Sequence, residues 1–444
     1  MPRYSKKRQI EYTLGIISGL EAISNTTSML IDGDDGDYGI SCDPENDLED
    51  NSNDRTLRYN PLSLVPWGEL LDKISSQRYL DRSQKIPRAP SRIDWLFNEL
   101  DDERFTQEVR MSKDAFNMIL DKIKDDPIFV SSGPKPQKPV FLQLLVTTRR
   151  LGFYGNGASI GNIARYYGVR EGSVIKYTNR CIKAICLFES TYIHWPSEQE
   201  KYISKKYFSS SFLFDDCLGI IDGTLFFLAN EPCSTEAQSY FSYKKKYGIS
   251  GILVCNSNKQ IIYSYIGWPG STHDSRIFSN SSIFRYPGLY FKENEYLLGD
   301  SGFECLKNII VLYKKPRNSE LTDQQDTFNM RLSSVRIHIE HTIGILKMRF
   351  QSLRELPIQL QDKDSAKHAV DWIKACMILH NMITAYRLDD IYNEEELTTI
   401  LQEQQQQNSI RYDRRFNRAT DLEEDLTPGK ARRKEIFNQV MNSE

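Results

Sequence analysis

The chain lacks the features that mark membrane proteins, secreted proteins and zinc modules. No stretch approaches the roughly 18–20 consecutive apolar residues that a membrane span needs, and the first residues show no pattern of a secretory signal. The eight cysteines are scattered and include no Cys-x-x-Cys pair. This usage argues against a zinc module and favours reduced thiols, as in a cytosolic or nuclear protein. We therefore expect no membrane association.

A strong net charge is also missing. The formal net charge of the 444 residues is −3, which argues against a protein coated all over with nucleic acid. The charge is uneven, however, because residues 32–54 are heavily acidic whereas segments 242–246, 314–317 and 345–354 are basic. Local patches matter more than total charge for binding a polyanion.

Composition and pattern divide the chain into four regions. A hydrophobic content of 39% over 444 residues predicts a globular protein of two or three domains. Residues 1–88 are predicted to be a largely disordered, acidic N-terminal region. Residues 89–205 have helical periodicity, and residues 206–388 carry the strand patterns. Residues 389–444 are predicted to form a solvent-exposed helix or a disordered tail.

The helical region contains a pattern typical of a helix-turn-helix. A short helix is predicted to end near Tyr167, Gly168 provides a turn, and a second helix begins after Arg170. The same pattern occurs in helical bundles that never touch DNA, so both interpretations stay open. Residues expected in the core of this element are Val169, Val174 and Ile175, and candidates for DNA contact are Arg170, Lys176 and Arg180.

Between about 207 and 313 the period changes from helix to strand. Short β-branched and aromatic runs, bounded by Gly, Pro, Asn and Ser, predict strands, and NSNK between the second and third runs predicts a hairpin turn. The order is a three-strand meander, a helix, further strands and closing helices. That order is typical of the ribonuclease-H-like α/β fold, preceded here by the all-α region.

Four acidic residues lie in settings that do not suit solvated surface charges. They are Asp222 in LGIIDGTLFF, Asp274 in GWPGSTHDSRIF, Asp300 in YLLGDSGF and Glu340 in RIHIEHTIGILKMRF. An unpaired buried charge is costly, and several carboxylates in one domain suggest a divalent metal as the compensation. If the strands of Asp222 and Asp300 are neighbours, these two side chains face each other and need a bridging cation.

Glu340 is expected on a helix whose apolar stripe includes Ile337, Ile343 and Leu346, so we expect it to point inward with that face. A pair of Mg²⁺ or Mn²⁺ ions suits such an all-oxygen site, where two ions can activate the attacking oxygen of a phosphodiester cleavage and stabilise the leaving one. Basic residues near this helix, which would hold a phosphate backbone, are Arg331, Arg336, Lys347 and Arg349.

Asp274 has two interpretations. It follows His273 at the expected start of a helix, where a carboxylate in the first turn is favourable because of the helix dipole. Alternatively, it is a further metal ligand or a group that orients one. His273 itself fits a structural hydrogen bond better than a ligand.

Five separated motifs resemble a known family. IDGT, GSTHDSRIF, LLGDSGF, FNMRLSSVRIHIEHTIGILKMRF and CMILHNMI, in this order, are similar to the transposases of the PIF/Harbinger superfamily and the nuclease-like proteins domesticated from them. The resemblance covers roughly residues 110–385. It implies a ribonuclease-H-like catalytic core with a DDE triad and divalent metal, and a preceding helical region with a helix-turn-helix.

The resemblance assigns the triad residue by residue. Asp222 matches the first acid and Glu340 the last, while HDS at Asp274 and GDSGF at Asp300 compete for the second. In the ribonuclease-H order the second acid ends the strand that follows the first helix, and Asp300 has that position. The predicted triad is therefore Asp222, Asp300 and Glu340, with Asp274 as an additional acidic member of the metal site.

The resemblance implies a metal-dependent DNA endonuclease or transposase that acts on transposon terminal repeats. The alternative is a domesticated DNA- or chromatin-binding protein without cleavage activity; a metal phosphatase or RNase is a third hypothesis. It further implies a Myb-like DNA-binding partner protein, room for a homo-oligomer, and location in the nucleus, with the cytoplasm as a second site.

Overall fold

The computed structural model describes residues 10–20, 67–76, 92–93, 95–131, 133, 136–233, 236–315, 320–386 and 427–442. The chain divides into two compact units, Met1–Pro87 and Arg88–Glu444. In the first unit, residues 10–20 and α2 (Trp67–Ser76) are helical. The prediction of disorder over 1–88 is therefore wrong for these two segments, and the acidic run 32–54 lies outside the described residues.

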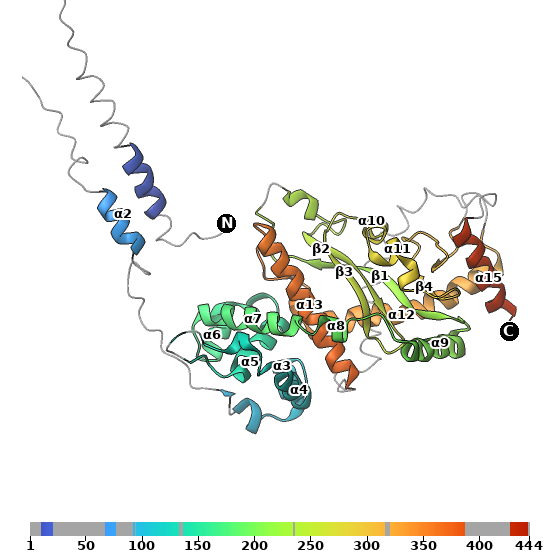
Figure 1. The fold of residues 1–444 in the computed structure, drawn as a ribbon, viewed down its shortest axis with the longest axis horizontal. Helices are drawn as coiled ribbons and strands as arrows, with labels where there is room; N and C mark the ends of the chain where they lie inside the picture. Colours follow the sequence, from blue (N-terminus) through green and yellow to red (C-terminus); the bar gives the residue numbers. More distant parts are fainter. Residues whose placement is uncertain are drawn as a thin grey trace, which may run out of the picture. The chain divides into compact units, whose positions relative to one another are not determined.

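The second unit is a mixed α/β structure (Figure 1). Its strands are β1 (Cys217–Phe227), β2 (Gly248–Cys255), β3 (Ile261–Pro269), β4 (Tyr296–Gly299) and β5 (Ile309–Val311). The helices before the sheet are α3 (Asp102–Val109), α4 (Lys113–Ile123), α5 (Val140–Gly152), α6 (Ile160–Tyr166), α7 (Glu171–Cys186), α8 (Glu189–Tyr192) and α9 (Glu198–Phe212). Those within and after it are α10 (Asp274–Ser279), α11 (Ser282–Arg285), α12 (Asp323–Arg349), α13 (Lys363–Ala385) and α15 (Pro428–Asn442). None of the described helices combines the length and the apolar composition that crossing a bilayer requires.

The five strands form one sheet in the order β3-β2-β1-β4-β5. The first three strands pair antiparallel, and β4 and β5 continue the sheet parallel to β1. The predicted hairpin between β2 and β3 is present. Its turn is held by the side chain of Asn256, which accepts hydrogen bonds from the N–H groups of Asn258 (2.9 Å) and Gln260 (3.0 Å). The central strand β1 therefore has an antiparallel neighbour on one side and a parallel neighbour on the other.

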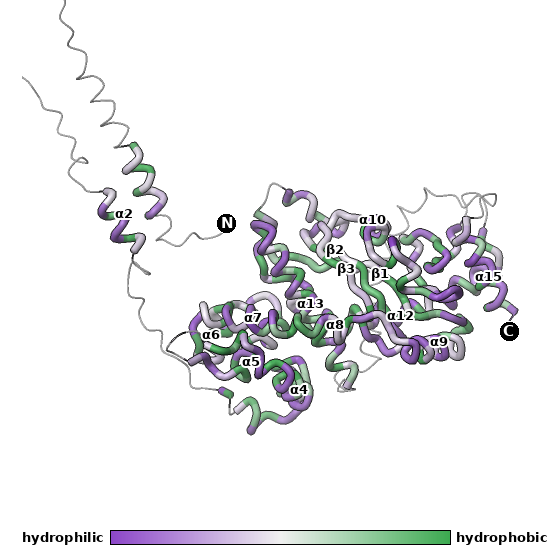
Figure 2. The backbone as a smooth tube through the Cα atoms, in the orientation of Figure 1, coloured by the Kyte–Doolittle hydropathy of each residue, from purple (hydrophilic) through white to green (hydrophobic). Residues whose placement is uncertain are grey.

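Alternate residues of the strands supply two apolar layers, because successive side chains point to opposite faces. One face carries Ile220, Leu253 and Leu298, which pack in the same cluster as apolar residues of α12 and α13. The other face carries Ile221, Ile252 and Leu297, which pack with Ile277 and Phe278 of α10. Figure 2 shows β1 and β4 coloured mainly as hydrophobic, as expected for strands covered on both faces.

The helical region and the sheet share one core. A single hydrophobic cluster runs from Leu96 to Val440, although the sequence predicts separate domains over 89–205 and 206–388. The reason is α13, which is buried almost all round from Trp372 to Ile383. A helix that is apolar on every side must be covered on every side, so it packs against β3 and also against α7.

The two helices predicted around a glycine turn are present as α6 and α7. Gly168 has a φ of 62°, a left-handed conformation that glycine adopts without strain, and the N–H of Val169 donates to the Ala164 carbonyl at 2.9 Å. Val174 is fully buried as predicted. Ile175 is 40% exposed, so its prediction as a core residue is wrong; the buried face of α7 continues instead through Tyr177 and Thr178.

The end of the chain is docked on the core. In α15, Ile436 and Val440 are buried, and the Phe437 ring lies 5.6 Å from the rings of both Tyr313 and Phe328. The prediction of an exposed helix or disordered tail over 389–444 is wrong for α15. The short, mixed-charge pattern concealed one apolar edge, while the glutamine run lies outside the described residues.

Candidate active site

Asp222 and Asp300 lie side by side at one edge of the sheet. Ile221 of β1 pairs with Gly299 of the parallel strand β4, so the next residue of each strand is an aspartate. Parallel strands present their carboxyl ends at the same edge, where the backbone of β4 has just finished its ladder. The Asp222 side chain is 20% exposed and that of Asp300 is 17% exposed. The sequence order of the strands thus brings two half-desolvated carboxylates together.

Glu340 reaches the same edge from α12, but not by the route that the sequence suggested. The buried face of α12 is formed by Phe328, Leu332, Val335, Ile339 and Leu346. Ile337, predicted to be part of the buried stripe, is 45% exposed. Glu340 is 25% exposed and flanks the buried face. A helix can be rotated by a fraction of a turn without disturbing its apolar period, and here tertiary packing sets that rotation.

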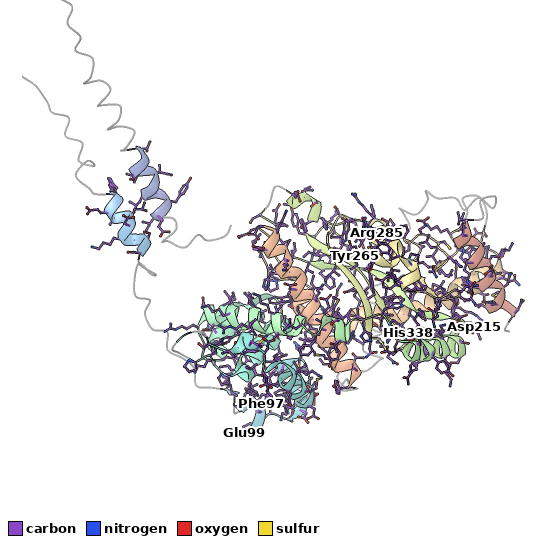
Figure 3. All side chains as sticks on the ribbon, viewed as in Figure 1. Phe97, Glu99, Asp215, Tyr265, Arg285 and His338 are labelled. Carbon is purple, nitrogen blue, oxygen red and sulfur yellow. The ribbon has the colours of Figure 1, made fainter. Side chains whose placement is uncertain are left out.

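Contacts of His338 help to fix the rotation of α12. Figure 3 labels His338, which lies near α9. Its Nε2 atom is 3.1 Å from the hydroxyl of Tyr207, and its ring makes edge contacts with Tyr207, Phe208 and Phe212. Anchored on this side, α12 presents Arg336 and Glu340, one turn apart, to the strand ends.

The three acids converge on one guanidinium group. Arg336 Nη1 lies 3.4 Å from Asp300 Oδ1, and Arg336 Nη2 lies 3.9 Å from Asp222 Oδ1 and 3.6 Å from Glu340 Oε1. The Arg336 side chain is 16% exposed. These distances are longer than the roughly 2.7–2.9 Å of a short charge-assisted hydrogen bond. The guanidinium therefore stands among the three carboxylates, within ion-pair distance of each.

Asp274 approaches from the opposite face of the sheet. It is the first residue of α10, as the first-turn interpretation predicts, and the residue as a whole is exposed. Its carboxylate, however, lies over Gly223, where a β-carbon would overlap the Asp274 carboxyl group. Gly223 follows Asp222 and belongs to the other face of β1. The missing side chain thus lets a fourth carboxylate reach the end of the strand.

Burial and mutual repulsion raise the pKa values of two acids. Burial raises the pKa of Asp222 to about 7; Arg336 opposes this shift, and Asp300, Asp274 and Glu340 reinforce it. Burial of the carboxyl group, followed by the charge of Asp300, raises the pKa of Asp274 to about 6. Asp222 and Asp274 therefore resist ionisation, and such a cluster gains stability from an added cation.

The donor set fits a hard divalent cation. Four carboxylates at one edge provide the oxygen ligands that Mg²⁺ and Mn²⁺ prefer, and the glycine cradle leaves room for one of them. Within the described ranges, no three His, Cys, Asp or Glu side chains are already arranged to hold a metal. The residues therefore fit the metal in kind, while their present side-chain positions are those of a site organised around Arg336.

Two lysines line the site, and one of them was not singled out from the sequence. Lys347 Nζ donates to Thr224 Oγ1 and to the Leu225 carbonyl, both at 2.9 Å, and burial lowers its pKa to about 7. Burial also lowers the pKa of Lys244, against the attraction of Asp222 and Asp274. The only sequence signal for Lys244 was the basic run at 242–246.

Lys244 sits at the tip of a defined hairpin that precedes β2. The Ser242 N–H donates to the Lys246 carbonyl at 2.9 Å, and the Ser242 hydroxyl donates to the same oxygen at 2.6 Å. Lys245 takes the left-handed conformation (φ 58°) typical of a three-residue hairpin loop. Phe241 and Tyr247 stack across the base at 5.1 Å. The tip therefore has a fixed shape.

Arg349, predicted to contact DNA, is wholly buried. Its Nη1 atom lies 3.1 Å from His380 Nδ1 of α13, so its side chain is a core group joining α12 to α13. The prediction of a surface role for Arg349 is wrong for this arrangement. Its place in the last turn of a basic, amphipathic-looking segment concealed the fact that α13 covers it.

Three further predicted DNA contacts belong to the predicted helix-turn-helix: Arg170 precedes α7, and Lys176 and Arg180 lie on α7, which packs on α13. Arg170 and Lys176 are exposed. Arg180 is partly buried, and its Nη1 is 3.5 Å from Gln143 Oε1 of α5. Two of the three candidates are therefore open to a ligand.

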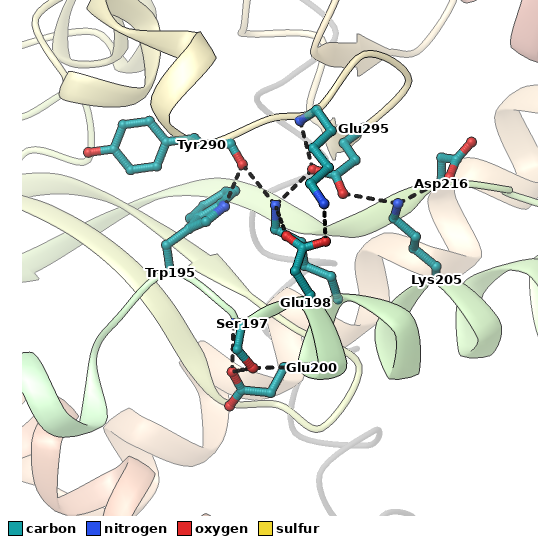
Figure 4. A network of polar contacts seen from close by, with 10 residues as sticks. Trp195, Ser197, Glu198, Glu200, Lys205, Asp216, Tyr290 and Glu295 are labelled. Atoms are coloured by element: carbon teal, nitrogen blue, oxygen red, sulfur yellow. Dashed lines mark hydrogen bonds and ion pairs between the residues drawn. The ribbon is translucent and has the colours of Figure 1, made fainter.

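A second charged cluster ties α9 to the segment before β4 (Figure 4). Glu295, only 2% exposed, pairs with Lys201 at 2.9 Å and with Lys205 at 3.0 Å. Lys205 also pairs with Asp216 at 3.2 Å, and Glu198 pairs with Lys201 and with Lys292. Every acid in this cluster has a lysine within ion-pair distance.

Comparison with known proteins defines the class. The family model described as "DDE superfamily endonuclease" matches residues 221–381. This span begins one residue before Asp222 and includes Asp274, Asp300 and Glu340. This part of the chain is therefore similar to the DDE superfamily endonucleases.

The curated relatives confirm the resemblance to Harbinger-derived proteins. The chain is 23% identical over 301 residues to an ALP1-like protein of Arabidopsis thaliana, covering 64% of this chain and 71% of that protein. It is 24% identical over 241 residues to the nuclease-named HARBI1 proteins of Bos taurus and Homo sapiens, covering 54% of this chain and 66% of each relative. No solved structure matches the chain.

Proposed function

We propose that this protein is a metal-dependent DNA endonuclease or transposase of the Harbinger type, which cuts and joins phosphodiester bonds at transposon ends. The observation that carries the proposal is the meeting of four carboxylates, from β1, β4, α10 and α12, inside the DDE endonuclease domain. The sheet order, a three-strand meander extended by two parallel strands, supports a ribonuclease-H-like core.

Asp222, Asp300 and Glu340 are the residues that would hold the divalent metal, and Asp274 is positioned to join them. When bound, the metal would activate the attacking oxygen and stabilise the leaving one. The chain's own cations have a separate task. The negatively charged phosphate backbone would be attracted and oriented by Lys244, at the hairpin tip, and by Lys347, beside Thr224 and Leu225 of β1. Arg336 would neutralise the acids until they are engaged.

DNA is the proposed partner, and α6 with α7 is the proposed helix-turn-helix. Arg170 and Lys176 are exposed at and after the start of α7, where such an element presents side chains to DNA. Terminal repeats as target, a Myb-like helper, a homo-oligomer and nuclear location extend the same proposal. A DNA- or chromatin-binding protein without cleavage is the second candidate, and the arginine-neutralised acids favour it if Arg336 cannot be displaced.

Cleavage of duplex DNA that carries the flanking inverted repeats tests the proposal. Full-length protein with Mg²⁺ or Mn²⁺ is expected to nick or cut this DNA, and Asp300→Asn is expected to lower the rate by at least about a thousandfold, since metal stabilisation of charge contributes several kcal/mol. Asp326→Asn, which removes an exposed acid of the same helix α12, should cut normally.

Two further arms separate the alternatives. Arg170→Ala with Lys176→Ala should raise the DNA concentration needed for half-maximal cleavage without changing the maximal rate. Equal cutting of RNA would favour the RNase hypothesis. Wild-type protein that binds the DNA and leaves it intact, alone or with a helper, would establish the non-cleaving alternative.

A further inference from the structure

Arg336 occupies the centre of the acidic site, and its position has a consequence for metal binding. We propose that Arg336 is a built-in countercharge that excludes the divalent metal, so that metal enters only when the guanidinium moves away. This inference rests on the proposed function, because it concerns the same metal site. The four acids would hold the metal, whereas Arg336 would keep it out.

The guanidinium of Arg336 lies at the centre of three acids. Its two terminal nitrogens face one oxygen from each of Asp222, Asp300 and Glu340 at 3.4–3.9 Å. An arginine that serves one carboxylate makes two short parallel hydrogen bonds to it. Here one guanidinium is shared among three acids from three elements. It occupies the position that a bridging cation would take.

The guanidinium excludes a metal ion from the same carboxylates. Mg²⁺ is held about 2.0–2.1 Å from its oxygen ligands, so the same carboxylate oxygens would have to close around an ion. A guanidinium among them blocks that closure and repels a second cation.

The Arg336 side chain can move out of the acidic site. Arg336 precedes Glu340 by one helical turn, and its neighbours on α12, Ser333 and Ile337, are exposed. Rotation about the side-chain bonds of Arg336 can therefore carry the guanidinium towards solvent without moving the helix backbone. A divalent ion carries twice the charge of the guanidinium that it would replace among the acids.

Mn²⁺ binding to the full-length protein at pH 7.5, followed by electron paramagnetic resonance of the free ion, tests the inference without any cleavage. Arg336→Gln is expected to bind Mn²⁺ at least about tenfold more tightly than wild type, since a unit charge within about 4 Å interacts strongly even at a high effective dielectric. Lys244→Gln is the matched control. It also removes one positive charge that acts on Asp222 and Asp274, but not a charge among the carboxylates, and should change affinity by about threefold or less.

A conservative variant keeps the test decisive if Arg336→Gln does not fold without metal. Arg336→Lys keeps the charge but replaces the planar fork with a single point charge, and should bind Mn²⁺ with affinity between wild type and Arg336→Gln. Thermal melting in EDTA reports which variants are folded. Equal Mn²⁺ affinity of wild type and both Arg336 variants would overturn the inference and leave the proposed function standing. Absence of Mn²⁺ binding in every variant would overturn both.

Discussion

Two clusters of partly buried charge lie on this sheet, and they differ in their balance. In the cluster beside α9, three lysines face three acids, and Glu295 makes ion pairs at 2.9 and 3.0 Å. In the other cluster, Asp222, Asp300 and Glu340 surround Arg336, whose ion pairs are 3.4–3.9 Å long, and Asp274 approaches from the opposite face of the sheet. The first cluster is complete within the chain. The second has more negative charge than its central arginine can neutralise.

The pKa values of the two clusters move in opposite directions. Burial alone would raise the pKa of Glu295, but hydrogen bonds from the Lys292 backbone, Lys201 and Lys205 lower it below its usual value. For Asp222, burial raises the pKa to about 7, and the pull of Arg336 does not offset this. A balanced cluster stabilises its charges, whereas an unbalanced one stores a demand for a cation. The imbalance marks the second cluster as the functional one.

Breaking the balanced cluster should have the largest effect on stability. Glu295→Gln leaves Lys201 buried without its main partner, and removing one member of a buried ion pair costs about 3–5 kcal/mol. Urea unfolding followed by circular dichroism measures this loss. Glu198→Gln, at an acid that is 63% exposed, should cost far less, since solvent screens exposed ion pairs. Similar losses for the two variants would contradict the structural role assigned to Glu295.

Neutralising the unbalanced cluster should have the opposite sign. Because the folded-state pKa of Asp222 is raised from 3.8 to about 7, the protonated form is favoured on folding. Its contribution to stability is complete below pH 3.8 and is lost as the pH rises through about 7. Asp222→Asn should therefore stabilise the metal-free protein at pH 8 by on the order of 2–4 kcal/mol, at about 1.4 kcal/mol per pKa unit.

The measurement is the unfolding free energy in EDTA at pH 5 and pH 8 for both proteins. The gain from Asp222→Asn should shrink at pH 5, and saturating Mn²⁺ should stabilise the wild type more than the variant. If Asp222→Asn raised the unfolding free energy equally at both pH values, or lowered it at pH 8, ionisation of Asp222 would not be unfavourable in the folded protein.

The glycine cradle should show the smallest effect. Gly223→Ala places a β-carbon where the Asp274 carboxylate lies, so that carboxylate must move, at a cost of about 1–3 kcal/mol. Gly172→Ala is the matched control, since a β-carbon there meets nothing within 4 Å, and alanine should stabilise α7 by roughly 0.5–1 kcal/mol. If Asp274 is a metal ligand, Gly223→Ala also weakens Mn²⁺ binding; unchanged stability and unchanged binding would remove Asp274 from the site.

Much of the fold was readable from the sequence because its signals are local. The strand runs, the hairpin at NSNK and the glycine between α6 and α7 each depend on a few neighbouring residues. The strand order then places Asp222 beside Asp300, since Ile221 of β1 pairs with Gly299 of the parallel strand β4. The resemblance supplied the link to Glu340, which no local pattern could give.

The errors concern features that tertiary packing decides. The rotation of α12 leaves Ile337 exposed, and coverage by α13 buries Arg349. Docking of α15 depends on Tyr313 and Phe328, more than a hundred residues earlier in the chain. The contact of Asp274 with Gly223 joins α10 to β1, and the centring of Arg336 joins three elements. None of these contacts is indicated in the sequence by a hydrophobic period or a motif.

The most direct test of the account is the Mn²⁺ affinity of the wild-type protein compared with that of Asp300→Asn, measured at pH 7.5 on the full chain. Asp300 ends β4 and faces both Asp222 and Asp274, so its loss should weaken Mn²⁺ binding by at least about tenfold, since each carboxylate is a direct ligand of a hard cation. Asp326→Asn should bind as the wild type does. Asp300→Asn that binds Mn²⁺ as tightly as the wild type, or a failure of both the wild type and Arg336→Gln to bind Mn²⁺, would contradict the claim that these acids form a metal site.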